Sequence, residues 1–233
     1  MNLRELTKKF EEIKNNGFVP SMRSGTTGIG FTLEMLLGIK ENNLPIPDIG
    51  GRTEIKTIRK NSSSLVTLFT FNKGVWNIKQ KDLILKYGYL DEKNRMALKN
   101  TVFYGKDTAQ GLSINVDENK NIIQLCDTKN DTILATWDVY VIVGKFMTKL
   151  SRLILVLADR QVLENREYFH YNEVYFLTNP SPRGLIIAFK NQSVGVDIRM
   201  HLKENGTVRN RGTAFRVKES NLTEFYEQRI RLI

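Results

Sequence analysis

The chain has 233 residues, of which 41% are hydrophobic and 26% charged, and a formal net charge of +10. This length can bury a substantial core, as one large domain or two small ones. No run of about 18 apolar residues occurs, so no membrane-spanning helix is predicted. A single cysteine, Cys126, excludes an internal disulfide, and the charged N-terminal segment lacks the apolar core of a secretory signal. These features predict a cytoplasmic location.

The excess of basic residues predicts a polyanionic partner, with nucleic acid the first candidate and an acidic membrane surface the second. Residues 181–233 carry ten Lys/Arg against five Asp/Glu. Such clustering favours a binding surface, although a generally basic proteome would give the same net charge. The two histidines, His170 and His201, are too few for a histidine-based zinc site, and no Walker-type or G-x-G-x-x-G loop occurs. Any catalysis must therefore rest on carboxylates and lysines.

Apolar spacing predicts two N-terminal helices, at residues 3–15 and about 29–37. Thr26 or Thr27 can cap the second helix and Gly38 can end it. The glycines at positions 25, 28 and 30 are unusual at a helix start, unless another backbone, such as that of DNA, comes close. Glu34 lies off the apolar stripe of this helix, where a solvated surface glutamate is the simplest interpretation.

The stretch PDIGGRTEIK at 47–56 combines two acids, a Gly-Gly turn and a lysine. If residues 52–58 form a strand, Glu54 and Lys56 project from one face, because side chains alternate along a strand. Asp48 precedes the turn and can fold back beside them. Two carboxylates and an ammonium at a strand end can hold a divalent cation and activate a water. A surface hairpin with an ion pair is the alternative.

The remaining pattern predicts a mixed β-sheet with flanking helices, an α/β fold. Strand-like segments lie at 65–70, pairing with the strand at 54–56, and at 112–116, 122–126, 132–137, 153–158, 194–200 and 213–217. Helices are predicted within 76–89 and at 138–150, 182–190 and 220–229. A polar stretch without an assigned element follows up to 108, the segment 201–212 is predicted as a loop, and 168–178 is ambiguous. We predict a single domain with a catalytic lobe, centred on about 1–110 plus 138–160, and a recognition lobe, centred on about 165–233.

The ordered motifs resemble the MvaI/BcnI family of type II restriction endonucleases, relatives of the nicking enzyme MutH in the PD-(D/E)xK superfamily. The catalytic motif alone is weak, whereas six matches in family order are specific. They are GTTGIG at 25–30 with Glu34, PD at 47–48 with EIKT at 54–57, LFT at 68–70, YG at 87–88, VDIR at 196–199 and GTAFR at 212–216.

This resemblance implies a PD-(D/E)xK restriction-endonuclease-like (MutH-like) fold and a monomeric, Mg²⁺-dependent enzyme. Such an enzyme hydrolyses double-stranded DNA one strand at a time, and its host carries a cognate DNA methyltransferase. The family's catalytic roles fall on Asp48 and Glu54 as Mg²⁺ ligands, on Lys56 beside the attacking water, and on Glu34 as an auxiliary acid.

The resemblance also implies two sets of DNA-binding residues. The first is the glycine loop on the minor-groove side, with Thr26, Thr27, Gly28 and Gly30. The second faces the major groove, with Asp197, Arg199, Arg209, Arg211 and Arg216. Arginine pairs with guanine and a carboxylate accepts from cytosine N4, so a G·C-dominated site is expected. Family members read CC, one central pair, then GG.

One departure concerns Arg209-Asn210-Arg211, where relatives have a histidine-bearing turn; contacts to phosphates are the alternative role for these arginines. Two other functions remain open at this stage. One is a MutH-like nicking or repair endonuclease, and the other is a non-catalytic basic module that binds DNA or RNA. The central base pair, the cut position and the number of metal ions are left open by the sequence.

Overall fold

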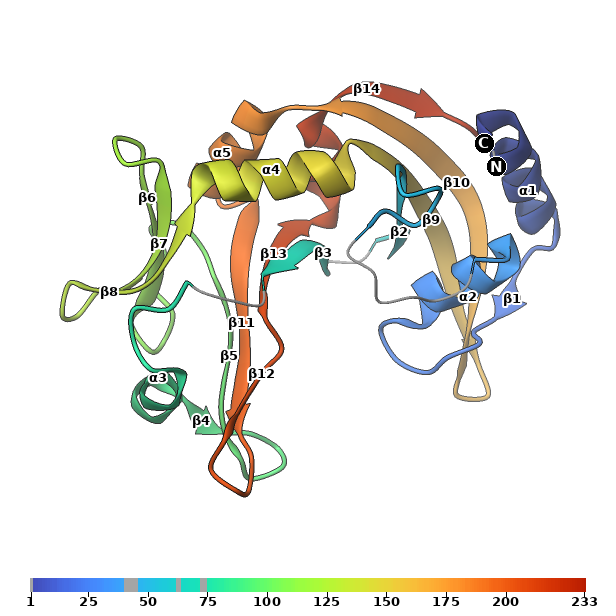
Figure 1. Ribbon diagram of the computed structural model, residues 1–233. Helices are drawn as coiled ribbons and strands as arrows, with labels where there is room; N and C mark the ends of the chain where they lie inside the picture. Colours follow the sequence, from blue (N-terminus) through green and yellow to red (C-terminus); the bar gives the residue numbers. More distant parts are fainter. Residues whose placement is uncertain (1, 40–45, 62–63, 72–74) are drawn as a thin grey trace. The chain divides into compact units, whose positions relative to one another are not determined.

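The computed structural model describes residues 2–39, 46–61, 64–71 and 75–233 (Figure 1). The chain folds into two compact units, each built from segments far apart in the sequence. The first comprises Met1–Val66, Met147–Ser181 and Glu219–Ile233, and the second comprises Thr67–Phe146 and Pro182–Lys218. Residues 67–110, which the sequence grouped with the catalytic lobe, thus contribute to the second unit. Among the described helices, none is long and apolar enough to cross a membrane.

A five-stranded sheet forms the centre of the first unit, in the order β1-β10-β9-β2, with β14 also paired to β10. The long antiparallel strands β9 and β10 form a curved ribbon (Figure 1), and β2 runs parallel to β9. The apolar run at 153–158 supplies the buried part of β9, as its composition predicted. The strands are β1 (Val19–Pro20), β2 (Glu54–Arg59), β9 (Arg152–Leu163), β10 (Arg166–Pro180) and β14 (Tyr226–Arg231).

Two helices, α1 (Leu3–Asn15) and α2 (Gly28–Leu37), pack their apolar faces against this sheet. The core residues that they share with β9 and β10 include Phe10, Leu33, Val156 and Phe169, all buried. Thr27 takes the cap position of α2 without a side-chain hydrogen bond, and Gly38, with φ of 74°, ends the helix as expected. The Tyr171 hydroxyl donates to the carbonyl of Ile29 at 2.8 Å, which fixes α2 to the sheet.

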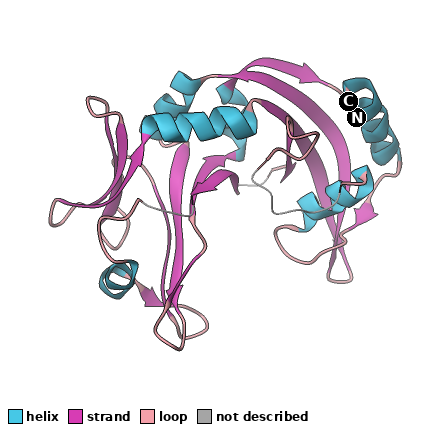
Figure 2. Cartoon of the chain, viewed as in Figure 1, coloured by secondary structure: helices cyan, strands magenta, loops and turns pink. Residues whose placement is uncertain are grey.

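The second unit contains a six-stranded and a three-stranded sheet (Figure 2). The larger sheet has the order β3-β13-β11-β5-β4, with β12 also paired to β11, and the smaller has the order β6-β7-β8. The ring of Phe215 packs against those of Phe69, Trp137 and Phe189 at centroid distances of 5.2–5.8 Å. The strands are β3 (Leu65–Phe71), β4 (Tyr89–Leu90), β5 (Met96–Val102), β6 (Leu112–Asp117), β7 (Ile122–Asp127), β8 (Thr132–Asp138), β11 (Val194–Leu202), β12 (Val208–Asn210) and β13 (Thr213–Lys218). The helices are α3 (Gln80–Tyr87) and α5 (Pro182–Lys190), and the residues of α4 (Val139–Leu150) are divided between the two units.

Two predictions of the sequence are wrong. Strand β3 pairs with β13 instead of β2, because the buried apolar strand β9 lies beside β2 in parallel. Residues 220–229 do not form a helix; a 3₁₀ segment, η1 (Glu219–Phe225), leads into β14, which pairs with β10. In both cases sheet pairing between distant segments overrides local spacing. The predicted loop at 201–212 also contains a strand, β12, and the polar stretch up to 108, which carried no prediction, contains β5.

A buried carboxylate joins α3 to the three-stranded sheet. Asp127, at the end of β7, has a side chain only 1% exposed. It accepts hydrogen bonds from the Tyr87 hydroxyl at 2.6 Å and from Asn130 Nδ2 at 2.7 Å, and Lys86 Nζ lies 3.2 Å away. The hydrogen bond from Tyr87, followed by that from Asn130, lowers the pKa of Asp127 below its usual range.

We expect Asp127→Asn to lower the free energy of unfolding by about 1–3 kcal/mol near neutral pH, because charge-assisted hydrogen bonds are lost. A depressed pKa stabilises the fold above the ordinary carboxyl pKa of 3.8, and this stabilisation is lost as the pH falls through the lower folded value. Urea unfolding should therefore show a gap between wild type and variant that narrows below about pH 4. A gap that does not change with pH would contradict this assignment.

Candidate functional site

Helix α2 and strand β2 together line a groove of about 320 Å³ in the first unit. Glu34 and Lys56 both line it, so the structure brings the predicted auxiliary acid and the predicted lysine to one surface. Thr26, Thr27 and Gly30 of the glycine loop line the same groove. Five of the predicted site residues thus line one groove, which the spacing in the sequence did not establish.

Glu54 and Lys56 lie on one face of β2, as strand alternation predicted. Lys56 Nζ is 2.5 Å from Glu54 Oε1, and the Glu54 side chain is 4% exposed. A second ammonium, Lys149 Nζ, lies 3.5 Å from the same oxygen. The sequence predicted the helix at 138–150 but not Lys149 as a site residue. Only the parallel pairing of Glu54 with Leu153, in the strand that follows this helix, brings Lys149 to the site.

Asp48 folds back onto the start of β2. Its Oδ2 accepts a hydrogen bond from the backbone N–H of Ile55 at 2.8 Å, and Gly50 and Gly51 make the turn at φ of 57° and 66°. Positive φ at both positions suits glycine, which carries no Cβ. The turn therefore places Asp48 next to the strand that carries Glu54, as predicted.

The donor set fits a hard divalent cation. Glu54 Oε2 is buried and has no hydrogen-bond partner in the part of the chain that the structure describes. A buried carboxylate oxygen without a partner is costly, and a cation would satisfy it. Within residues 2–39, 46–61, 64–71 and 75–233, no group of three His, Cys, Asp or Glu side chains is placed to hold a metal. Asp48 and Glu54 would thus supply part of a coordination shell, which suits a cation that retains waters and binds phosphate oxygens.

Tyr226 lies close enough to Glu54 to sense its charge. Burial, and to a lesser extent the Glu54 carboxylate, raise the pKa of the Tyr226 phenol. Its hydroxyl donates to the carbonyl of Leu150 at 2.9 Å. The hydrogen bond therefore anchors the Tyr226 phenol to the backbone at the end of α4.

Gly28 and Gly30, in the first turn of α2, differ in how closely they are packed. A Cβ on Gly28 would lie 2.3 Å from the carbonyl oxygen of Arg23 and 2.6 Å from Ser21 Oγ. At Gly28 the close backbone is thus the chain's own. A Cβ on Gly30 would meet nothing within 4 Å, and Gly30 lines the groove. The close packing of the chain itself explains the glycine at position 28. Close approach of DNA is therefore needed only to explain the glycine at position 30.

In the second unit, one face of strand β11 carries charged side chains and the other carries apolar side chains. Asp197 and Arg199 share one face, while Val196, Ile198 and Met200 are buried on the other. Asp197 Oδ2 lies 3.4 Å from both Arg199 Nε and Arg216 Nη1. Asp197 Oδ1 accepts a hydrogen bond from Thr101 Oγ1 at 3.2 Å, a contact that the sequence did not predict because the pairing of β5 with β11 was unknown.

These three charged side chains differ in exposure. The Asp197 side chain is 9% exposed, against 37% for Arg199 and 30% for Arg216. Arg209 lies on β12 and Arg211 follows that strand, and both are exposed. The backbone N–H of Arg211 donates to the carbonyl of Arg199 at 3.1 Å. The structure thus gathers Asp197, Arg199 and Arg216 into one ion cluster and places Arg209 and Arg211 on the neighbouring segment.

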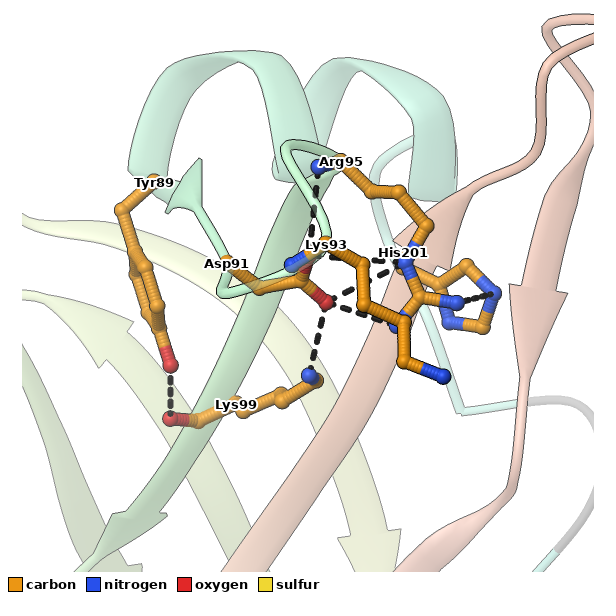
Figure 3. A network of polar contacts seen from close by, with 6 residues as sticks. All are labelled: Tyr89, Asp91, Lys93, Arg95, Lys99 and His201. Carbon is orange, nitrogen blue, oxygen red and sulfur yellow. Dashed lines mark hydrogen bonds and ion pairs between the residues drawn. The ribbon is translucent and has the colours of Figure 1, made fainter.

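A polar network fixes one end of the same sheet (Figure 3). Asp91 Oδ2 contacts Arg95 Nη2 at 2.7 Å and Lys99 Nζ at 2.8 Å, and Arg95 Nη1 lies 3.3 Å from His201 Nε2. Hydrogen bonds from Arg95, then Lys99, hold the pKa of Asp91 below its usual range, and burial lowers the pKa of His201. Lys99 stands directly opposite Arg199 in the sheet. The network therefore restrains the strands that carry Arg199.

A mixed α/β fold with Glu54 and Lys56 on one strand, and Asp48 folded back beside it, fits the restriction-endonuclease-like class of nucleases. The chain belongs to the MvaI/BcnI restriction endonuclease family, whose model matches residues 7–226. It is a type II restriction endonuclease. The fold class, the enzyme class and the family resemblance predicted from the sequence are thus confirmed.

Two solved structures cover the whole chain. One, described as a restriction endonuclease MvaI–cognate DNA substrate complex, has 26% identity and a TM-score of 0.82, with 100% of each chain covered. The other, MvaI in the absence of DNA, has 26% identity and a TM-score of 0.58, with 100% of this chain and 99% of that chain covered. No curated protein sequence matches the chain. These comparisons support DNA as the partner and metal dependence as a family property, while the individual site residues remain predictions.

The two glycines provide a matched test of the loop. Gly28→Ala should destabilise the protein by about 1–3 kcal/mol, because the added methyl overlaps a backbone carbonyl. Gly30→Ala lies inside α2 in open space, so it should be neutral or stabilising by up to about 1 kcal/mol. Thermal unfolding without DNA measures both. Equal stability of the two variants would show that the loop is not packed as described.

Proposed function

We propose that the chain is a Mg²⁺-dependent, site-specific endonuclease that hydrolyses phosphodiester bonds of double-stranded DNA at a short G·C-dominated site of the type CC-N-GG. The observation that carries this proposal is the buried oxygen Glu54 Oε2, which lacks a hydrogen-bond partner among the described residues. It lies on the same strand face as Lys56, in a chain of a restriction endonuclease family. The MvaI complex with its cognate DNA supports the substrate class.

In this proposal Asp48 and Glu54 hold the metal. When bound, Mg²⁺ would neutralise charge on the scissile phosphate and lower the pKa of a bound water. Lys56 positions the attacking water and stabilises the charge that develops on the phosphate. Glu34, on the same groove, orients Lys56 or that water. Lys149 helps to hold the Glu54 carboxylate through its contact with Oε1, which leaves Oε2 for the metal.

Base recognition is proposed for the second unit, as the recognition lobe, with the first unit as the catalytic lobe. Arg199 and Arg216 present guanidinium groups suited to the O6 and N7 of guanine. Asp197 holds both arginines in place, or accepts from cytosine N4 once they move to bases. Arg209 and Arg211 contact base edges or phosphates. In the first unit, Thr26, Thr27, Gly28 and Gly30 belong to the loop on the minor-groove side.

The proposal includes a cytoplasmic monomer that cuts the two strands in turn, in a host with a cognate DNA methyltransferase. A nicking enzyme of the MutH type and a non-catalytic DNA-binding module are its competitors. Supercoiled plasmid incubated with Mg²⁺ separates them. Linear fragments of fixed length support restriction, persistent open circles support nicking, and binding without cleavage in Mg²⁺ or Mn²⁺ supports the module.

We expect Glu54→Gln and Lys56→Ala to reduce cleavage at least about 10²–10³-fold, because each removes a charge at the reacting phosphate. The measurement is single-turnover cleavage of plasmid DNA, with duplex binding measured in parallel. Glu11→Gln, at an exposed position of α1, is the matched control and should cleave like wild type. If both site variants cleave like wild type, the catalytic assignment is wrong.

We expect Arg199→Ala and Arg216→Ala each to cost about 1–3 kcal/mol of discrimination at one base pair. Run-off sequencing of cleaved plasmid should show relaxed specificity at a guanine position. Arg183→Ala, an exposed residue of α5, removes the same charge and should leave the pattern unchanged. An unaltered pattern in the first two variants would remove them from base recognition.

A further inference from the structure

A second concave surface lies in the first unit, with a volume of about 840 Å³. We call it the basic hollow. Three segments line it: the loop at 21–26, the end of β2 with Lys60, Asn61 and Ser64, and the end of the β9–β10 hairpin. Its charged lining consists of five basic side chains and one acid: Arg23, Arg59, Lys60, Arg160, Arg166 and Glu167.

The single acid of the hollow is already paired. Glu167 Oε2 lies 3.0 Å from Arg59 Nη2, and Glu167 Oε1 lies 2.5 Å from Arg160 Nε. Burial acts to raise the pKa of Glu167, but hydrogen bonds from Arg59 and Arg160 outweigh it and lower that pKa below its usual value. The carboxylate is therefore ionised near neutral pH and offsets one of the five positive charges. Lys60 forms its ion pairs with Glu173 and Asp159, outside the lining.

Two of the arginines keep donors for a ligand. Arg160 is anchored through Nε alone, and its Nη1 and Nη2 donate to no described residue. Arg166 is anchored to the carbonyl of Ser21 through Nε and Nη2, at 3.2 and 3.0 Å, which leaves Nη1. Guanidinium groups held in place with N–H groups to spare suit an oxyanion, and phosphate above all. Arg59, in contrast, uses its guanidinium on Glu167 and on the carbonyl of Thr26 at 3.2 Å.

The hollow adjoins the groove that contains Lys56. Arg23 and Thr26 line both surfaces, so the glycine loop is the wall between them. Arg59 lies three residues beyond Lys56 on β2 and bonds to that loop. A DNA backbone that presents one phosphate to Lys56 is a continuous polyanion, and its other phosphates need cationic partners nearby.

We propose that the basic hollow binds a backbone phosphate of the DNA substrate, away from the phosphate that is cut, through Arg160 and Arg166. This rests on the proposed function. A phosphate contact of this kind positions the DNA without reading its sequence. Arg160 and Arg166 therefore contribute to the affinity for any duplex and to the alignment of the scissile phosphate with Lys56.

The test is DNA binding by Arg160→Gln and Arg166→Gln, measured as a function of salt. Duplexes with and without the recognition site are titrated with Ca²⁺ in place of Mg²⁺. We expect each variant to bind both duplexes about tenfold more weakly. The slope of log K against log[salt] should become shallower by about 0.9, the value for one lost phosphate contact. Lys8→Gln, at an exposed position of α1 outside the hollow, removes the same charge and should keep the wild-type slope.

Two further measurements separate a phosphate contact from a purely structural ion pair. Arg160→Lys keeps the positive charge, so its slope of log K against log[salt] should return most of the way to the wild-type value. The melting temperature of Arg160→Gln measures how much the ion pair with Glu167 stabilises the fold. If Arg160→Gln lowers the melting temperature but keeps the wild-type slope, the arginine is structural and the proposal is overturned. It is equally overturned if only the duplex with the recognition site is affected.

Failure of the proposed function has a different signature. A wild-type protein that neither binds nor cleaves either duplex would remove the nuclease proposal, and the phosphate site with it. A wild type that cleaves normally, with unchanged slopes in the arginine variants, would remove the phosphate site alone.

Discussion

The parallel pairing of β2 with β9 holds the Glu54 carboxylate in a buried position, and the rest of the candidate active site depends on it. Glu54 stands opposite Leu153, the second residue of a strand that directly follows α4. That register brings Lys149 within 3.5 Å of Glu54 Oε1, while Lys56 reaches the same oxygen from two residues along β2. One oxygen of a buried acid thus contacts two ammonium groups, and the other has no hydrogen-bond partner among the described residues.

The neighbouring segments are tied to the sheet of the first unit by hydrogen bonds to backbone groups. Asp48 is held by the N–H of Ile55, and α2 is held by the hydroxyl of Tyr171. Arg59, on β2 itself, bonds to the carbonyl of Thr26 in the glycine loop. A metal-dependent nuclease needs its acids, its lysine and its phosphate-binding groups fixed relative to one another, because small displacements weaken catalysis steeply. The first unit meets this need with hydrogen bonds that involve β2 and β10 of one sheet.

The sequence predicted features that follow from local geometry. Strand alternation places Glu54 with Lys56 and Asp197 with Arg199, and the Gly50-Gly51 turn returns Asp48 to the strand. Contacts set by distant pairing were not predicted. Lys149 at Glu54 and Thr101 at Asp197 depend on strand registers that no local pattern encodes. The same limit explains the wrong partner for β3 and the missed strand β14. Gly28 shows a related limit, since its packing against Arg23 was not visible in the sequence.

The central claim is that Glu54 Oε2 is a metal ligand of a nuclease. Its most direct test is a crystal structure of the wild-type protein with duplex DNA and Ca²⁺. We expect a cation within about 2.3–2.6 Å of Glu54 Oε2, shared with Asp48 and a phosphate oxygen. A complex in which that oxygen is bonded to a lysine or another protein donor, with no cation beside it, would contradict the account.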